Sequence, residues 1–158
     1  MQYSKPQTWC LVLLQLAIGW HLLYEGAAKL NNPDWSAEGY LLDSAGWFSG
    51  MFHAMAENAS VLGLVNIVNS WGLAIVGLAL ILGLFTRVAL VAGMVFLALY
   101  FLSHPPLIDV EYALPSEGNY LWVDKTLIEL VAMSVLLVFP VSHIIGLDRL
   151  IAKRGAAS

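Results

Sequence analysis

Three ionisable side chains follow one another at intervals of four residues in an apolar stretch near the start of the chain. They are His21, Glu25 and Lys29, and this spacing places them along one face of a helix. A later apolar stretch carries a second set, consisting of Asp124, Lys125 and Glu129. An imidazole beside carboxylates can exchange protons with a bound substrate at neutral pH. The residue types therefore predict a proton-exchanging site with His21, Glu25 and Glu129 in the catalytic roles.

The elements that carry these residues are expected to be membrane spans. Of the 158 residues, 59% are hydrophobic and 11% are charged, against roughly 25% charged in soluble domains. A span needs about 20 apolar residues, and four such runs occur, at about 9–30, 70–86, 88–103 and 121–140. The second run is started near Ser70 because an earlier start would put Asn66 and Asn69 in the membrane. The fold class predicted is all-α, as a single four-helix membrane domain over residues 1–158.

Two further elements are expected outside the spans. Residues 47–58 mix aromatic and Met side chains with polar ones, which is typical of an amphipathic helix at the membrane surface. Only Thr86 and Arg87 separate the second span from the third, which predicts a tight hairpin. The glycines within the spans favour close packing of helices over cradling of a cofactor. They are Gly72, Gly77, Gly83 and Gly93.

The charged residues lie at different expected depths in the membrane, and they allow a structural and a functional interpretation. At about 1.5 Å per residue, Glu25 and Glu129 each lie about 6 Å inward from the lysine four residues away, and His21 lies deepest. The Glu25–Lys29 and Lys125–Glu129 spacings could simply give neutral pairs near the headgroups, and a membrane His is often a hydrogen-bonded packing residue. A buried charge costs several kcal/mol unless it is paired or wetted, so the same residues are also candidates for a binding site.

Aromatic side chains gather towards the same end of the spans, where an aromatic belt at the interface explains most of them. They are Trp20, Tyr24, Trp35, Tyr40, Trp47, Tyr100, Tyr112, Tyr120 and Trp122. A sharper hypothesis is that some of them flank a flat ligand such as a quinone headgroup, whose protons His21 and a carboxylate would handle. His21 and His104 could in principle ligate one haem iron, although no haem-attachment motif is present and their depths differ. The predicted ligand-binding set is Lys29, Lys125, Asp124, Trp20, Tyr24, Trp122 and His104.

The distribution of charge predicts the orientation in the membrane. Short cytoplasmic loops retain Lys and Arg, and five basic residues fall on one side of the predicted spans: Lys5, Arg87, Arg149, Lys153 and Arg154. The two loops on the other side hold seven acids and no Lys or Arg: Asp34, Glu38, Asp43, Glu57, Asp109, Glu111 and Glu117. Both termini are therefore expected in the cytoplasm, with the first span uncleaved because no small-residue cleavage site follows it.

Several classes of function are excluded by composition. The formal charge of −4 and the lack of a basic stripe argue against nucleic acid as a partner. The single cysteine, Cys10, excludes an intrachain disulfide, a CxxC redox pair and an all-cysteine metal site. The sequence contains no nucleophile motif, phosphate-binding loop or zinc signature. No metal site is therefore predicted, and the chemistry must come from His, carboxylate, Lys and aromatic side chains.

Four segments together resemble the DoxX/DoxD-type small membrane proteins over roughly residues 9 to 150: LAIGWHLLYEGAAKL, GLALILGLFTRVAL, GNYLWVDKTLIEL and GLDRL. The residues that fit the family pattern are Gly19, Glu25, Gly26, Lys29, Thr86, Arg87, Asn119, Lys125 and Glu129. The resemblance implies a four-helix protein of the bacterial inner (cytoplasmic) membrane. The DoxD branch is named for the small subunit of a thiosulfate:quinone oxidoreductase, and DoxX-like members are associated with membrane oxidoreductase assemblies.

Three hypotheses of function remain open at this level. The first is a subunit of a quinone-linked oxidoreductase, which acts at the outer face with electrons from a small reduced sulfur compound or from a partner's cofactor. The second is a non-enzymatic accessory or scaffold that holds a membrane or periplasmic protein through the outer loop 31–69. The third is a small transporter or lipid-binding protein, for which a narrow bundle would need to form a homo-oligomer. The lipid bilayer is a partner in all three, and quinone is the candidate cofactor.

Overall fold

The computed structural model describes residues 3–107, 110–114 and 121–149, and within these ranges it contains helices and loops but no strand. The helices are α1 (Lys5–Leu30), α2 (Glu38–Leu42), α3 (Ser49–Glu57), α4 (Ala59–Leu82), α5 (Thr86–Ser103) and α6 (Lys125–Val138). The all-α prediction is confirmed. The predicted residues Asp109, Glu117, Asn119, Tyr120, Lys153 and Arg154 lie outside the described ranges.

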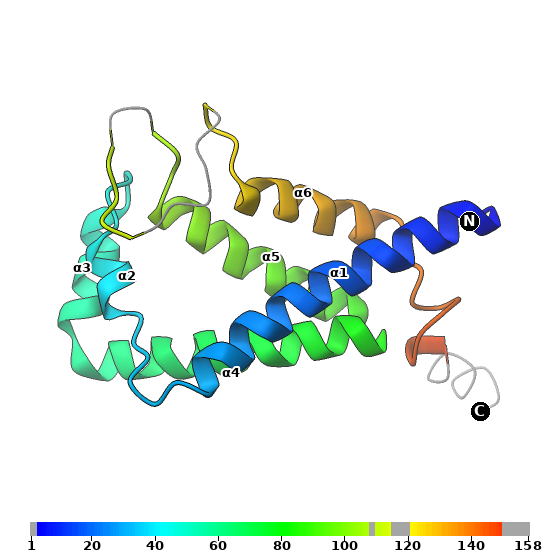
Figure 1. Ribbon diagram of the computed structural model, residues 1–158, viewed down its shortest axis with the longest axis horizontal. Coiled ribbons are helices and arrows are strands. Elements are labelled where there is room, and N and C mark those ends of the chain that lie inside the picture. Colours follow the sequence, from blue (N-terminus) through cyan, green and yellow to red (C-terminus); the bar gives the residue numbers. More distant parts are fainter. Residues whose placement is uncertain (1–2, 108–109, 115–120, 150–158) are drawn as a thin grey trace.

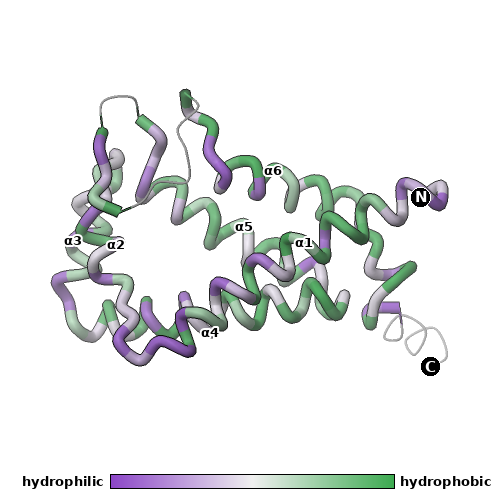
Figure 2. Tube along the Cα trace, in the orientation of Figure 1, coloured by the Kyte–Doolittle hydropathy of each residue, from purple (hydrophilic) through white to green (hydrophobic). Residues whose placement is uncertain are grey.

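Three of these helices, α1, α4 and α5, are long and apolar enough to cross a membrane. Figure 2 shows hydrophobic residues along most of α4 and α5, with hydrophilic residues gathered in the loops and at the helix ends. The protein is therefore a membrane protein with several spans. α6 begins four residues after the predicted start of the fourth span, and its 14 residues extend about 21 Å. The fourth crossing thus stays a prediction.

The helix that carries the predicted second span begins earlier than that span. α4 begins at Ala59, where the Asn58 side chain accepts hydrogen bonds from the N–H groups of Ser60 and Val61. The polar residues that argued for a later start are paired inside the protein. Asn66 accepts a hydrogen bond from the Ala37 N–H at 2.9 Å and Asn69 accepts one from Lys29 at 2.7 Å. Since these amides have protein partners, they need not lie outside the membrane.

The turn between α4 and α5 comprises residues 83–85, and Thr86 is already the first residue of α5, so the predicted turn is displaced by a few residues. Gly83 ends α4 with φ 61°, a left-handed conformation that favours glycine. A Cβ at this position would also lie 2.8 Å from the Gly146 Cα. The chain after α6 is therefore packed directly on this turn.

Asp148 fixes this contact by capping α5 from a distance of more than sixty residues in the sequence. Its carboxylate accepts hydrogen bonds from the N–H groups of Phe85 and Thr86, at 2.7 and 3.1 Å. These groups belong to the first turn of α5, which has no side-chain cap of its own. Although burial alone would raise it, the hydrogen bonds to Thr86, Ser142 and Phe85 hold the pKa of Asp148 below its ordinary value of 3.8.

We expect Asp148→Ala to destabilise the protein by about 1 kcal/mol, the usual cost of losing a helix cap. Because the pKa is lowered in the folded state, this contribution is complete above about pH 3.8 and is lost as the pH falls through the folded-state value. Melting temperatures in mild detergent at neutral and acid pH measure the effect, with Arg149→Ala as the control. An Asp148→Ala variant as stable as wild type at neutral pH would contradict this role.

The bundle is built from antiparallel neighbours. α1 packs mainly on α4, α4 on α5, and α5 on α6. The N-terminus, the α4–α5 turn and the segment after α6 lie at one end, whereas α2 and α3 lie at the other (Figure 1). The core between the long helices consists of Ile18, Leu22, Leu73, Val76, Leu80, Ala89, Leu90, Leu97, Met133 and Leu136.

Glycines permit the close approach of α1 and α4. A Cβ on Gly77 would lie 2.2 Å from the backbone N of Leu23, and one on Gly26 would lie 2.4 Å from that of Ala74. Elsewhere, the ring of Phe96 packs on Gly72. The packing role predicted for the span glycines is confirmed for Gly72 and Gly77. It also places the residues of α1 at a fixed distance from those of α4.

α2 and α3 cover one end of the bundle and bury a small apolar cluster of Ala37, Leu41, Phe52 and Ala56. α3 lies within the stretch predicted as a surface helix, and it packs on α2 and α4. Its position at the membrane surface stays a prediction. α2 was not anticipated from the sequence. Together, α2 and α3 lie at the end of the bundle opposite the N-terminus (Figure 1).

Candidate functional site

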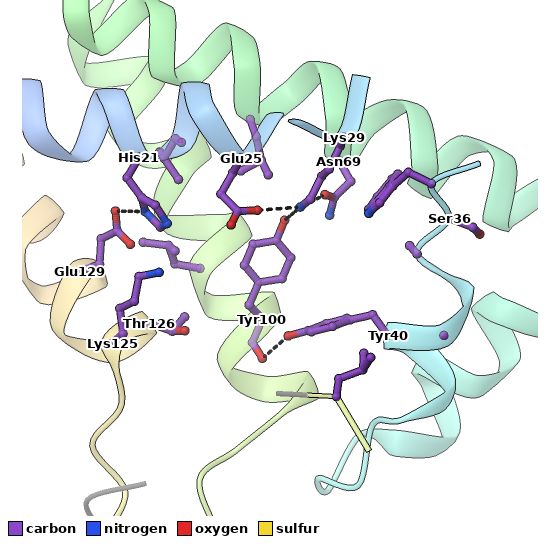
Figure 3. A pocket seen from close by; sticks show the side chains of 17 residues that line it. His21, Glu25, Lys29, Ser36, Tyr40, Asn69, Tyr100, Lys125, Thr126 and Glu129 are labelled. Atoms are coloured by element: carbon purple, nitrogen blue, oxygen red, sulfur yellow. Dashed lines mark hydrogen bonds and ion pairs between the residues drawn. The ribbon is translucent and has the colours of Figure 1, made fainter. Parts of the chain in front are cut away.

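A cavity of about 430 Å³ lies inside the bundle, between α1, α4, α5, α6 and the segment that includes α2. We call it the central cavity. Its polar lining is His21, Glu25, Lys29, Ser36, Tyr40, Asn69, Tyr100, Lys125, Thr126 and Glu129, and its apolar lining includes Leu22, Leu73, Leu97 and Trp35. Figure 3 shows that His21, Glu25 and Lys29 all project from α1 towards this space. The four-residue spacing in the sequence therefore does place the three side chains on one face, which is directed at the central cavity.

His21 and Glu129 form a contact between α1 and α6. His21 Nδ1 lies 2.9 Å from Glu129 Oε1, and the glutamate side chain is largely buried. The contact occupies Nδ1 of the ring, so Nε2 is the ring nitrogen left for a ligand. The arrangement gives an oriented imidazole backed by a carboxylate, which can take up or release a proton.

Lys29 lies at the other end of the same helical face and is held by several groups. Its Nζ donates to Asn69 Oδ1 at 2.7 Å and lies 3.5 Å from both Glu25 Oε2 and the Tyr100 hydroxyl. The ammonium also lies 5.1 Å from the ring centre of Trp35, within the range of a cation–π interaction. The Lys29 amine, with Glu25 beside it, therefore lines the central cavity about two helical turns along α1 from the His21–Glu129 pair (Figure 3).

Two tyrosines form an aromatic wall of the central cavity. The rings of Tyr40 and Tyr100 pack edge to face, with centroids 5.9 Å apart. The Tyr40 hydroxyl donates to the Tyr100 carbonyl oxygen at 3.4 Å. Burial, together with the neighbouring tyrosines and acids, raises the pKa of Tyr40 above its ordinary value. The phenol therefore stays protonated at neutral pH and acts as a donor.

His104 belongs to a separate cluster behind this wall. Its ring stacks on Tyr40 with centroids 4.0 Å apart, and its Nε2 lies 3.6 Å from Asp43 Oδ2. Burial lowers the pKa of His104, and the Asp43 carboxylate offsets this only in part, so the imidazole is neutral at pH 7. Asp43 also accepts hydrogen bonds from the N–H groups of Ala113 and Leu114. The cluster fixes the segment whose Leu114 lines the central cavity.

The residues predicted for the site are thus only partly brought together. His21, Glu25, Lys29, Lys125 and Glu129 line the central cavity. Asp124 does not line it, and its carboxylate instead caps α6 by accepting a hydrogen bond from the Leu127 N–H at 2.7 Å.

The predicted aromatic residues lie elsewhere. Trp20 and Tyr24 are 63% and 65% exposed on the outer side of α1. Trp122 packs near Trp47, with ring centroids 5.6 Å apart. None of these three is among the lining residues of the central cavity. His104 and His21 lie in different clusters. Among residues 3–107, 110–114 and 121–149 no three His, Cys, Asp or Glu side chains are grouped so as to hold a metal ion.

Sequence reasoning missed several polar and aromatic lining residues, among them Trp35, Tyr40, Asn69 and Tyr100. Trp35 and Tyr40 were assigned only to an interfacial belt, as was Tyr100. Asn69 carried the clearest signal, because an amide within a long apolar run requires a partner. It was used to exclude that run from the membrane, although it could equally have pointed to a buried polar partner such as Lys29.

Comparison with known proteins gives one match. The model of a family described as DoxX matches residues 10–105, which include most of α1 and all of α2 to α5. No curated protein and no solved structure matches the chain.

Proposed function

The chain belongs to the DoxX family, and from this premise we propose that it is the membrane subunit of a quinone-linked oxidoreductase whose central cavity binds the quinone headgroup. One observation carries the proposal: the His21–Glu129 pair and the Lys29 ammonium line a single cavity with aromatic walls. A pocket that is mostly apolar, with a few convergent polar groups, is typical of a binding site for a small organic ligand.

The chemistry of quinone reduction matches these groups. Reduction adds two electrons and two protons, which convert both carbonyl oxygens to hydroxyls. His21, oriented by Glu129, can deliver a proton to one oxygen and recover a proton afterwards. Lys29 can stabilise the negative charge that develops on the other oxygen, because Asn69 already holds its ammonium in place. A proton from water then converts this oxygen to the second hydroxyl. The electrons come from a small reduced sulfur compound or from a cofactor of a partner protein.

The charge pattern supports an orientation for this reaction. Lys5 begins α1, Arg87 lies in the first turn of α5, and Arg149 follows the residue that caps that turn. These elements meet at one end of the bundle (Figure 1), and that end is proposed to face the cytoplasm. The central cavity then lies towards the outer face of the inner membrane, with α6 and its flanking residues as the fourth crossing.

The test is binding of a quinone without a tail to the detergent-purified protein, measured by calorimetry and by quenching of tryptophan fluorescence. We expect His21→Ala and Lys29→Met each to weaken binding about tenfold or more, since each removes a polar contact with the ligand. His143→Ala is the matched control, because this histidine is exposed in the segment after α6.

Melting temperatures show that each variant is folded under the conditions of the titration. Unchanged affinity in both cavity variants would overturn the proposal. The non-enzymatic accessory hypothesis would then be the better account, and the search would turn to proteins that bind the end formed by α2 and α3.

A further inference from the structure

A second cavity, of about 250 Å³, adjoins the central cavity between α2, α3, α4 and α5. We call it the apolar cavity. Its lining is dominated by hydrocarbon side chains: Leu41, Phe52, Met55, Leu64, Val65, Val68, Phe96 and Leu99. The proposed function assigns no role to this space. An apolar chamber beside a polar one is the shape expected for a ligand that has a polar head and an apolar tail.

The two cavities share a wall. Ala37, Tyr40, Asn69 and Tyr100 line both of them. The polar atoms at this boundary are already used within the protein: Asn69 Oδ1 accepts from Lys29, and the Tyr40 hydroxyl donates to the Tyr100 carbonyl. A group that passes from one cavity to the other therefore meets aromatic rings and satisfied polar atoms. A hydrocarbon chain can cross such a boundary without leaving a hydrogen-bonding group unpaired.

The outer rim of the apolar cavity faces the hydrocarbon of the membrane. Leu64 and Val68 of α4 and Leu99 of α5 line it, and they are 62%, 48% and 42% exposed. Both helices are long and apolar enough to span the membrane. An exposed apolar rim on a membrane span is in contact with lipid chains, so the cavity is accessible to molecules dissolved in the bilayer.

We propose that the apolar cavity holds the hydrocarbon tail of the ligand whose headgroup occupies the central cavity, and that this ligand reaches the site from the lipid between α4 and α5. The inference rests on the proposed function and narrows its substrate to quinones with a long tail. A water-soluble quinone would use the central cavity alone. The occupant is the tail itself, and not the acyl chain of a neighbouring phospholipid.

The test compares two quinones with the same headgroup, one with a decyl tail and one with a methyl group in its place. Val65→Trp fills the apolar cavity with a ring, because Val65 is partly buried and lines it. Ile67→Trp is the matched control, since Ile67 lies two residues further along α4, is exposed, and is not among the residues lining either cavity. The measured quantity is the ratio of the two dissociation constants, so that partition of the tail into detergent cancels between variants.

We expect Val65→Trp to reduce the preference for the decyl quinone about tenfold while leaving the affinity for the methyl quinone unchanged, and Ile67→Trp to change neither. Val68→Trp provides the same test if Val65→Trp does not fold. An undiminished preference in the filled variant would overturn the inference and leave headgroup binding intact. If wild type binds neither quinone, the proposed function fails as well, so the two failures are distinguishable.

Discussion

Replacing Glu129 with Gln should lower the rate of quinone reduction by about 100-fold or more, the usual contribution of general acid–base catalysis. The glutamine has the same size and can still contact His21, whose Nδ1 lies 2.9 Å from the carboxylate in wild type. It has no carboxylate, so the imidazole loses the ionisable partner that is proposed to orient it. The loss should therefore lie in the turnover number, with quinone affinity and melting temperature close to those of wild type.

The assay is reduction of a short-chain quinone by membranes that contain the protein, with thiosulfate as the electron donor. Glu57→Gln is the matched control, because Glu57 is exposed at the end of α3 and does not line the central cavity. A Glu129→Gln variant that reduces quinone as fast as this control would show that the His21–Glu129 contact is structural.

Gly77→Ala should destabilise the protein by about 3 kcal/mol, at the upper end of the usual cost of overpacking. The added Cβ would lie 2.2 Å from the backbone N of Leu23 and 2.6 Å from the carbonyl oxygen of Gly19. Both atoms belong to the backbone of α1, so no side chain can rotate away to make room. α1 and α4 must separate, and the distance between Lys29 and Asn69 increases with them.

Gly63→Ala is a matched control within the same helix, because a Cβ at Gly63 would meet nothing within 4 Å. Alanine is the better helix former, so this variant should be at least as stable as wild type. Thermal unfolding in mild detergent measures both effects. If the Gly77→Ala and Gly63→Ala variants had the same melting temperature, the close approach of α1 and α4 would not hold the site in place.

The spans on either side of the site were predictable because their signal is local. The apolar runs of α1 and α5 end near polar or helix-breaking residues, and the boundaries predicted for them are close to those of the structure. The start of α4 was not predictable in this way. From the sequence alone, Asn66 and Asn69 are expected at the surface. Only the structure shows that Ala37 and Lys29 are their hydrogen-bond partners.

The site was predictable along one helix and not between helices. The spacing of His21, Glu25 and Lys29 fixes their common face, whatever the rest of the fold. Glu129 meets His21 because α6 packs beside α1. The spacing of Lys125 and Glu129 within one helix carries no information about this packing. For the same reason, the inner and outer sides of α1 could not be told apart for Trp20 and Tyr24, which lie on the outer side.

The most direct test of quinone binding is extraction and quantification of the small molecules that copurify with the protein in mild detergent from quinone-containing membranes. The account predicts a stoichiometric quinone with a long tail in the wild-type protein, and its loss from the His21→Ala and Lys29→Met variants. A wild-type protein that carries only bulk phospholipid, in the same amount as these variants, would contradict it.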